Sequence, residues 1–228
     1  MKKRIFFWMM GCLLNLAAQA QHQAILDEFR REAGDQSALF IGKIERGYSP
    51  VAYINHPYWE ADDFVFGDII YRGVAYREVL MRFDAYLQQL VVKSPERKTN
   101  VWLEMPSVEK FVMKGTEFAR RNGEFMGILF SSSRLELVEQ LHVSVKDVFS
   151  DKGKVQYRFE HDRTFLVLRD GQTYEVDKLK SVMKVFPEWK KELKWFAKTH
   201  KLNFKVHRQS SLITVIKYVD ELLAQSVN

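Results

Sequence analysis

The sequence predicts an α+β fold in which an antiparallel, β-rich meander is followed by a C-terminal segment of two to three helices. Three observations predict it. Between Ala38 and Val176, apolar and polar residues alternate in short runs, as expected of strands with one buried face. Turn-forming residues separate these runs closely, which favours antiparallel hairpins over a parallel α/β sheet. After Val176 the apolar residues recur at helical spacing. The body is therefore expected to be a sandwich or a partly closed barrel.

The N-terminus has the composition of a cleavable signal peptide. Three basic residues at positions 2–4 precede an apolar run over 5–16, and Ala18-Gln19-Ala20 forms an A-x-A cleavage site. The run is about a dozen residues long, shorter than the ~20 that a membrane-spanning helix needs. We therefore expect residues 1–20 to be removed and the protein to work in the periplasm or outside the cell, with no transmembrane helix in the mature chain.

A rival interpretation makes Cys12 a lipidated cysteine, because Gly11 precedes it as signal peptidase II prefers. Two methionines at positions 9 and 10 form a poor lipobox, and leucines continue the apolar run beyond the cysteine. The ordinary signal peptide is the preferred interpretation. Since Cys12 is the only cysteine, the mature chain would depend on packing rather than on disulfides for its stability.

The charge of the chain points to no particular class of partner. Of the 228 residues, 35 are Lys or Arg and 29 are Asp or Glu, and three of the basic residues lie in the predicted signal peptide, so the formal charge falls from +6 to +3 on cleavage. A balance of this size does not suggest nucleic-acid binding, which is also not expected in an exported protein. Residues 21–228 are enough to bury a real core.

Residues 21–177 are expected to form the β-rich body with a short helix at its start. The helix candidate is Ala24–Ala33, followed by the stop signal Gly34-Asp35. Strands are predicted around three alternating sets, namely Val79, Met81 and Phe83; Val101, Leu103 and Met105; and Leu141, Val143 and Val145. Chain reversals are predicted at Arg72-Gly73, Asn122-Gly123, Asp151-Lys152-Gly153 and Asp170-Gly171.

Residues 178–228 are expected to form a helical tail that packs on the body. The candidates are Leu179 to Phe186, a helix beginning at Pro187, which suits a first helical position, and Ser210 to about Gln225. In the second candidate, Trp189, Leu193 and Phe196 share one face, and lysines occupy the opposite one. In the last, an apolar stripe comprises Leu212, Ile216, Val219 and Leu223.

Several segments are similar to a group of exported envelope proteins of Bacteroidota that have no known activity. They are Tyr71–Tyr76 with Val79–Asp84, Phe165–Val176, which contains Asp170-Gly171-Gln172-Thr173-Tyr174, and Lys201-Leu202-Asn203-Phe204. The resemblance covers most of the mature chain, but it rests on turn glycines and core aromatics. It implies envelope localisation and an order of strands before helices, and no functional residue follows from it.

The search for catalytic, metal and cofactor motifs is negative. The sequence has no G-x-S-x-G elbow, no phosphate-binding glycine loop and no H-E-x-x-H motif. Glu160-His161-Asp162 is the nearest local cluster of metal-ligand types, but adjacent strand residues point to alternate faces. We interpret it as a solvated strand end, and we expect no catalytic residue, no metal site and no cofactor.

The segment from Tyr53 to Asp63 is the first candidate binding site, because it combines aromatic rings with carboxylates in an expected loop. Its candidate ligand-binding residues are Tyr53, His56, Tyr58, Trp59, Asp62 and Asp63. Exposed aromatic faces with polar neighbours suit a glycan or a peptide. The simpler interpretation, which we prefer, is that Tyr58 and Trp59 cap one end of the sheet while the aspartates are solvated.

The second candidate site is the lysine-rich helix face. Its candidate partner-binding residues are Lys190, Lys191, Lys194, Trp195 and Lys198. Such a face suits anionic lipid headgroups, lipopolysaccharide or an acidic envelope protein, but the simpler interpretation, which we prefer, is a solvated helix face rich in lysine. Trp195 lies off the apolar stripe, so its exposure would favour a binding role. The sequence thus predicts an exported binding or scaffolding protein of the bacterial envelope, with a carbohydrate- or peptide-active enzyme using the Tyr53–Asp63 loop as the alternative.

Overall fold

The computed structural model describes residues 38–95, 98–149 and 155–226. The predicted signal peptide over 1–20, with Cys12, lies outside these residues. So do the helix expected over Ala24–Ala33 and the turn expected at Asp151-Lys152-Gly153. None of the helices in the described part is long and apolar enough to cross a membrane.

The described strands form one eleven-stranded sheet in which every pair of neighbours is antiparallel. The spatial order is β1-β5-β4-β3-β2-β6-β7-β8-β9-β10-β11, so the two outer strands, β1 and β11, do not pair with each other. The predicted antiparallel body followed by helices is confirmed, and the sheet is not closed. The strands are β1 Lys43–Ile44, β2 Val65–Tyr71, β3 Val74–Asp84, β4 Gln89–Lys93, β5 Asn100–Trp102, β6 Val108–Met113, β7 Thr116–Arg121, β8 Glu124–Ser131, β9 Leu135–Phe149, β10 Val155–Arg169 and β11 Gln172–Glu175.

Two-residue turns with left-handed backbone connect several of the hairpins. Both residues of Arg72-Gly73, Asn122-Gly123 and Asp170-Gly171 have positive φ, between 51° and 90°. Two successive residues with positive φ are the signature of the turn that matches the twist of the flanking strands. The three predicted reversals are confirmed, and Lys114-Gly115, with φ of 47° and 77°, adds a fourth between β6 and β7.

The alternation of apolar residues corresponds to burial on one face of each strand. Val79, Met81 and Phe83 of β3 are at most 7% exposed. Leu141 and Val143 of β9 are also buried. The run beginning at Val101 is a strand only as far as Trp102, and a 3-10 turn, η3 (Met105–Ser107), follows. A further 3-10 turn, η2, covers Ala38–Phe40.

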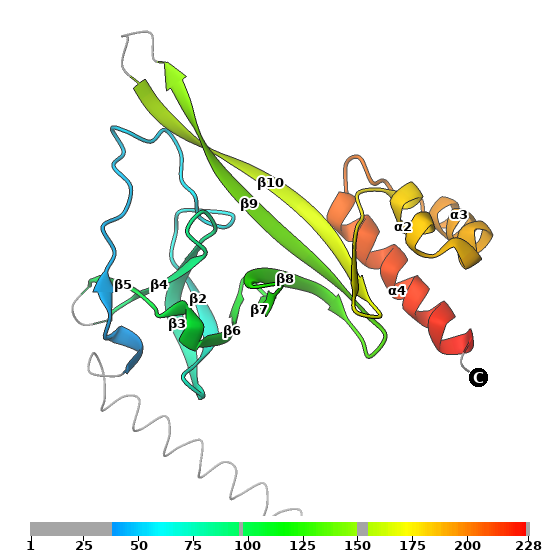
Figure 1. Ribbon diagram of the computed structural model, residues 1–228, viewed down its shortest axis with the longest axis horizontal. Helices are drawn as coiled ribbons and strands as arrows, with labels where there is room; N and C mark the ends of the chain where they lie inside the picture. The colour runs from blue at the N-terminus through cyan, green and yellow to red at the C-terminus, as the bar shows by residue number, and fades with distance from the viewer. Residues whose placement is uncertain (1–37, 96–97, 150–154, 227–228) are drawn as a thin grey trace, which may run out of the picture.

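The longest hairpin, made of β9 and β10, runs from the strand-rich end of the molecule to the helices (Figure 1). Its two strands are 15 residues each and pair in register along their full length. Glu160, His161 and Asp162 lie in the middle of β10 and not at a strand end, which corrects that part of the prediction, and all three are exposed.

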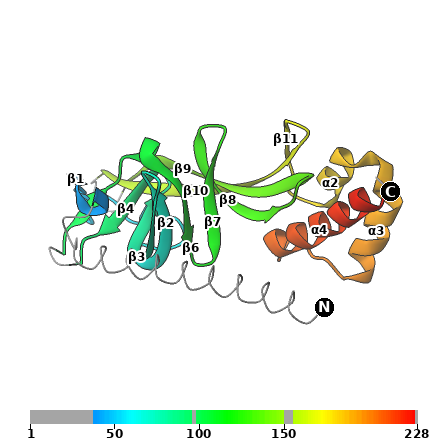
Figure 2. The ribbon, with the colours of Figure 1, turned by 90° about the horizontal axis from the view of Figure 1, so that it is seen from below.

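Three α-helices follow the last strand in the described part of the chain: α2 Leu179–Val185, α3 Lys190–Thr199 and α4 Arg208–Ser226, with the 3-10 turn η4 Pro187–Trp189 before α3. They correspond to the three helix candidates. Figure 2 shows them gathered at one end of the molecule, beyond β8 and β11.

Two hydrophobic cores share the long hairpin. The first core joins β2–β6 to Leu141, Val143 and Phe159 of the hairpin. The second core joins Leu137 and Val167, nearer the other end of the hairpin, to the three helices. An ion pair between Arg134 and Asp220, with Arg134 Nη2 to Asp220 Oδ2 at 2.7 Å, also links α4 to the sheet. The helices therefore pack on the sheet itself.

Candidate functional site

The segment between β1 and β2 crosses over to β10 and is tied to it by five hydrogen bonds, one of them from the Gln156 side chain to the Val51 carbonyl at 3.2 Å. The Tyr157 N–H donates to the Ala52 carbonyl at 2.7 Å, and the Ile54 N–H donates to the Tyr157 carbonyl at 3.0 Å. The Asn55 side chain donates to the Phe159 carbonyl and accepts from the Phe159 N–H, both at 2.7 Å. Because β11 pairs only with Leu166–Arg169 of β10, the crossing segment covers part of the edge that β11 leaves open.

This segment and β3 enclose a pocket of about 330 Å³, which we call the aromatic pocket. Its walls include Tyr48, Tyr53, His56, Tyr58, Asp62 and Arg82. The volume lies at the lower end of the range for small-molecule sites. The Tyr53–Asp63 loop is thus concave and does not lie flat on the sheet.

Arg82 of β3 holds one wall of the aromatic pocket in place. Its guanidinium forms ion pairs with Glu45, Nη2 to Oε2 at 2.8 Å, and with Asp62. It also lies 3.9 Å from the centre of the Tyr58 ring. The side chains of Arg82 and Glu45 are 12% and 2% exposed, so the charges depend on each other for stabilisation.

Two of the three tyrosines of the aromatic pocket donate their hydroxyl protons to buried carboxylates. Tyr58 donates to Glu45 Oε1 at 3.0 Å, and Tyr48 donates to Asp84 Oδ2 at 2.7 Å. Burial, which is the largest contribution, raises the pKa of Tyr48, Tyr58 and Asp84. Both tyrosines therefore stay protonated near neutral pH, and their hydroxyl protons already have acceptors.

His56, in the wall of the aromatic pocket, lies beside His161 of β10. Their ring centres are 6.0 Å apart, and the His56 ring stacks on Tyr58 with centres 5.9 Å apart. His161 is exposed as a residue, but partial desolvation of its ring first, and then the charges of His56 and Arg163, lower its pKa. No three His, Cys, Asp or Glu side chains cluster as a metal site anywhere in the described ranges.

The structure brings four of the six predicted loop residues to the pocket wall, namely Tyr53, His56, Tyr58 and Asp62. Trp59 instead enters the first core, 5% exposed, with its ring centre 4.9 Å from that of Phe118 in an edge-to-face arrangement. Asp63 is exposed and lies outside the pocket wall. The burial of Tyr58 and Trp59 agrees with the simpler interpretation, in which these two rings close one end of the sheet.

Sequence reasoning missed Glu45, Tyr48, Arg82 and Asp84. Arg82 and Asp84 sit in a predicted strand, and Glu45 and Tyr48 lie before the loop, so no local pattern relates them to it. The alternation in this strand places Arg82 on the face opposite Met81 and Phe83, where a charged residue is ordinary, so the sequence gives no signal for its role.

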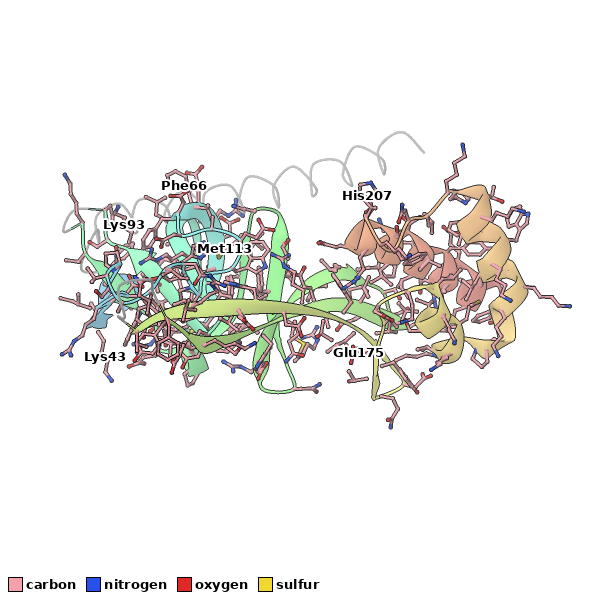
Figure 3. All side chains as sticks on the ribbon, turned by 90° about the horizontal axis from the view of Figure 1, so that it is seen from above. Lys43, Phe66, Lys93, Met113, Glu175 and His207 are labelled. Carbon is pink, nitrogen blue, oxygen red and sulfur yellow. The ribbon has the colours of Figure 1, made fainter. Side chains whose placement is uncertain are left out.

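The second candidate site lies on α3, at the other end of the molecule. In Figure 3, Lys43 of β1 lies near one end of the molecule, and His207, just before α4, lies with the helices that form the other end. The predicted residues Lys190, Lys191, Lys194, Trp195 and Lys198 are all exposed, and we call them the basic face. Leu193 and Ala197, on the other side of the same helix, are buried in or beside the second core.

Trp195 is 62% exposed at the centre of the basic face. Lys191 precedes it by four residues and Lys198 follows it by three, so both neighbour it on the helix surface. None of the four lysines of the basic face forms an ion pair with another described residue. A large aromatic ring and unneutralised charges are therefore both left to solvent.

The chain matches no protein-family model, no curated protein and no solved structure. The two sites are therefore interpreted from their geometry. The aromatic pocket offers ring faces and a small number of polar groups, most of which are already paired, so it suits binding better than proton transfer. The basic face offers free positive charge and one exposed indole, which suits a negatively charged partner.

Proposed function

We propose that the protein is an exported, non-catalytic binding protein of the bacterial cell envelope, and that its basic face docks on an anionic lipid surface. The observation that carries the proposal is the 62% exposure of Trp195 between Lys191 and Lys198. An indole ring combines an apolar body with a polar N–H, which favours the boundary between lipid and water. Unpaired lysines beside it contribute about 1 kcal/mol each near an anionic surface.

The N-terminal signal pattern supports the same proposal, because a cleaved chain would reach the envelope, where anionic lipids and lipopolysaccharide are available. An envelope protein or a glycan are the other partners that the sequence admits. Lipid is preferred to an acidic protein because the basic face is a convex helix surface with one protruding ring, and the larger protein interfaces bury several such anchors.

The test is co-sedimentation of the purified protein with vesicles. Mixed phosphatidylglycerol and phosphatidylcholine vesicles should bind the protein, while pure phosphatidylcholine vesicles should not. Changing Lys190, Lys191, Lys194 and Lys198 to Glu should reduce binding to the mixed vesicles by tenfold or more, since four attractive charges become repulsive. High salt should weaken the wild-type interaction in the same direction.

A matched control carries the same change in net charge at four exposed basic residues of the body, Lys43, Arg46, Arg77 and Arg158, each changed to Glu. This control should keep most of the vesicle binding. Equal loss in both variants would show a dependence on net charge alone and would refute docking by the basic face. Crosslinking in the native envelope that recovers one stoichiometric protein partner, lost in the basic-face variant, would replace lipid by protein as the partner.

A second candidate function uses the aromatic pocket. The observation that favours it is that the Tyr53–Asp63 loop lines a concave space, as a carbohydrate or peptide site requires. Asp62, the one acidic residue of the pocket lining, is held in an ion pair by Arg82, so His56 has no free carboxylate partner in this lining, and binding is favoured over an enzymatic reaction. Calorimetric titration with glycans and peptides, compared between wild type and Tyr53→Ala, tests this candidate.

A further inference from the structure

A groove with a volume of about 710 Å³ lies between the start of α2, the end of α3 and the connection that leads to α4. We call it the basic groove. His207 marks this connection in Figure 3. The volume is within the range of small-molecule sites. The basic groove shares only Lys198 with the basic face.

The walls of the basic groove carry a strong excess of positive charge. Six basic side chains line it, namely Lys178, Lys180, Lys198, Lys201, Lys205 and Arg208. The one acidic residue of the lining, Asp177, is already bound by Lys178, Nζ to Oδ2 at 2.8 Å. The other five basic side chains make no ion pair within the described part of the chain. Charges of one sign that line one concavity repel one another, and a multiply charged anion would relieve this repulsion.

The floor of the basic groove is apolar. Leu179, Leu202 and Phe204 are partly buried and pack against the second core, and Ala197 is 7% exposed. A small inorganic anion would satisfy the charges but would leave this apolar floor in water. A ligand with a hydrocarbon part covers the floor as well, which adds about 25 cal/mol for each Å² of apolar surface removed from water.

Local hydrogen bonds hold the backbone of the groove walls before any ligand arrives. Asn203 Oδ1 accepts from the N–H groups of Lys205 and Val206, both at 3.1 Å. The Leu202 N–H donates to the Ala197 carbonyl at 3.0 Å, which ties the connection to the end of α3. On the opposite wall, the Ser181 hydroxyl donates to Asp177 Oδ1 at 3.0 Å. Binding therefore costs little additional ordering of the backbone.

From these four features we infer that the basic groove binds an anionic amphiphile, in which a phosphate group contacts the basic walls and a short hydrocarbon part covers the apolar floor. The inference goes beyond docking on a lipid surface and does not depend on it, because a dissolved ligand occupies the groove one molecule at a time.

Calorimetric titration of the purified protein with three soluble probes tests the ligand class. Dihexanoyl phosphatidate, below the concentration at which it forms micelles, should bind with a stoichiometry of one. Dihexanoyl phosphatidylcholine has the same chains without net charge and should bind at least tenfold more weakly. Inorganic phosphate should also bind at least tenfold more weakly. Equal binding of the choline lipid would refute the role of the basic walls, and equal binding of inorganic phosphate would refute the role of the apolar floor.

Two variants with the same change in net charge locate the site. Lys180→Glu, Lys205→Glu and Arg208→Glu, combined, alter the groove at exposed positions outside the basic face. Lys190→Glu, Lys191→Glu and Lys194→Glu, combined, alter the basic face outside the groove. The groove variant should lose at least tenfold in phosphatidate affinity, whereas the face variant should stay within about twofold, a difference of less than 1 kcal/mol. Similar affinities for the two variants would overturn the inference, even if vesicle docking is confirmed.

Discussion

The guanidinium carbon of Arg82 lies 3.9 Å from the centre of the Tyr58 ring. Since Arg82 belongs to β3 and Tyr58 to the segment between β1 and β2, this contact joins the crossing segment to the sheet. The ion pairs of Arg82 with Glu45 and Asp62 add two more attachments at the same place. Arg82 therefore fixes the crossing segment to β3, while the hydrogen bonds of Ala52, Ile54 and Asn55 fix it to β10.

Replacing Arg82 by Ala should lower the free energy of unfolding by about 3–5 kcal/mol, because Glu45 would remain buried without its partner. Arg82→Lys should cost less, since it keeps the charge and loses the planar, two-pronged geometry. Urea unfolding followed by circular dichroism measures both. Arg72→Ala is the matched control, because Arg72 and Glu104 form an ion pair at 50% and 66% exposure, which contributes about 0–1 kcal/mol. A cost for Arg82→Ala no larger than that of the control would contradict the prediction.

Asp84 should make stability depend on pH in the acidic range. Burial raises its pKa above 3.8 in the folded protein, so the folded state keeps this proton to higher pH than the unfolded chain does. The contribution of Asp84 to stability is therefore present below pH 3.8 and is lost as the pH rises through the raised folded-state pKa. Asp84→Asn stays neutral throughout, so its free energy of unfolding relative to wild type should increase over this interval.

Urea unfolding at a series of pH values from acidic to neutral measures this difference. Tyr48→Phe is a useful second variant, because the Tyr48 hydroxyl lowers the pKa of Asp84 by donating to it. Its removal should raise that pKa further and extend the pH interval upwards. A difference between wild type and Asp84→Asn that is constant with pH would show that Asp84 has the same pKa in both states.

Truncating a residue on the buried side of α3 should destabilise the protein, whereas truncating one on the exposed side should not. Leu193 is fully buried in the second core, so Leu193→Ala should cost about 2–5 kcal/mol of stability. Trp195 is 62% exposed, so Trp195→Ala should stay within about 0.5 kcal/mol of wild type. Thermal and urea unfolding measure both. A large loss in Trp195→Ala would place this ring in the core packing and remove the argument for a docking role.

The local features of the fold could be predicted because they are set by neighbouring residues. Arg72-Gly73, Asn122-Gly123 and Asp170-Gly171 need residues that tolerate positive φ, and the alternation in β3 follows from one buried face. The turn at Lys114-Gly115 obeys the same rule and was missed, because lysine is not a typical residue at a left-handed position. Helical periodicity placed Trp195 off the apolar stripe, and the structure decides that its ring is exposed.

The aromatic pocket could be predicted only in part. Tyr53, His56, Tyr58 and Asp62 were found because they share one loop, while Arg82 and Asp84 come from a strand some twenty residues or more further along the chain. Nothing in the sequence near the loop indicates which strand it crosses. The position of Trp59 in the loop suggests the same site, but its ring packs against Phe118 in the first core.

The sequence by itself determined the antiparallel strands, three of the hairpin turns, the order of strands before helices and the two faces of α3, since these depend on backbone preferences and on the periodicity of apolar residues. The tertiary structure alone decided where the β1–β2 segment crosses β10, how Arg82 meets Glu45 and Asp62, and which lysines line the basic groove. These features depend on contacts between residues far apart in the chain. Their geometry is set by the packing of the two cores on one long hairpin.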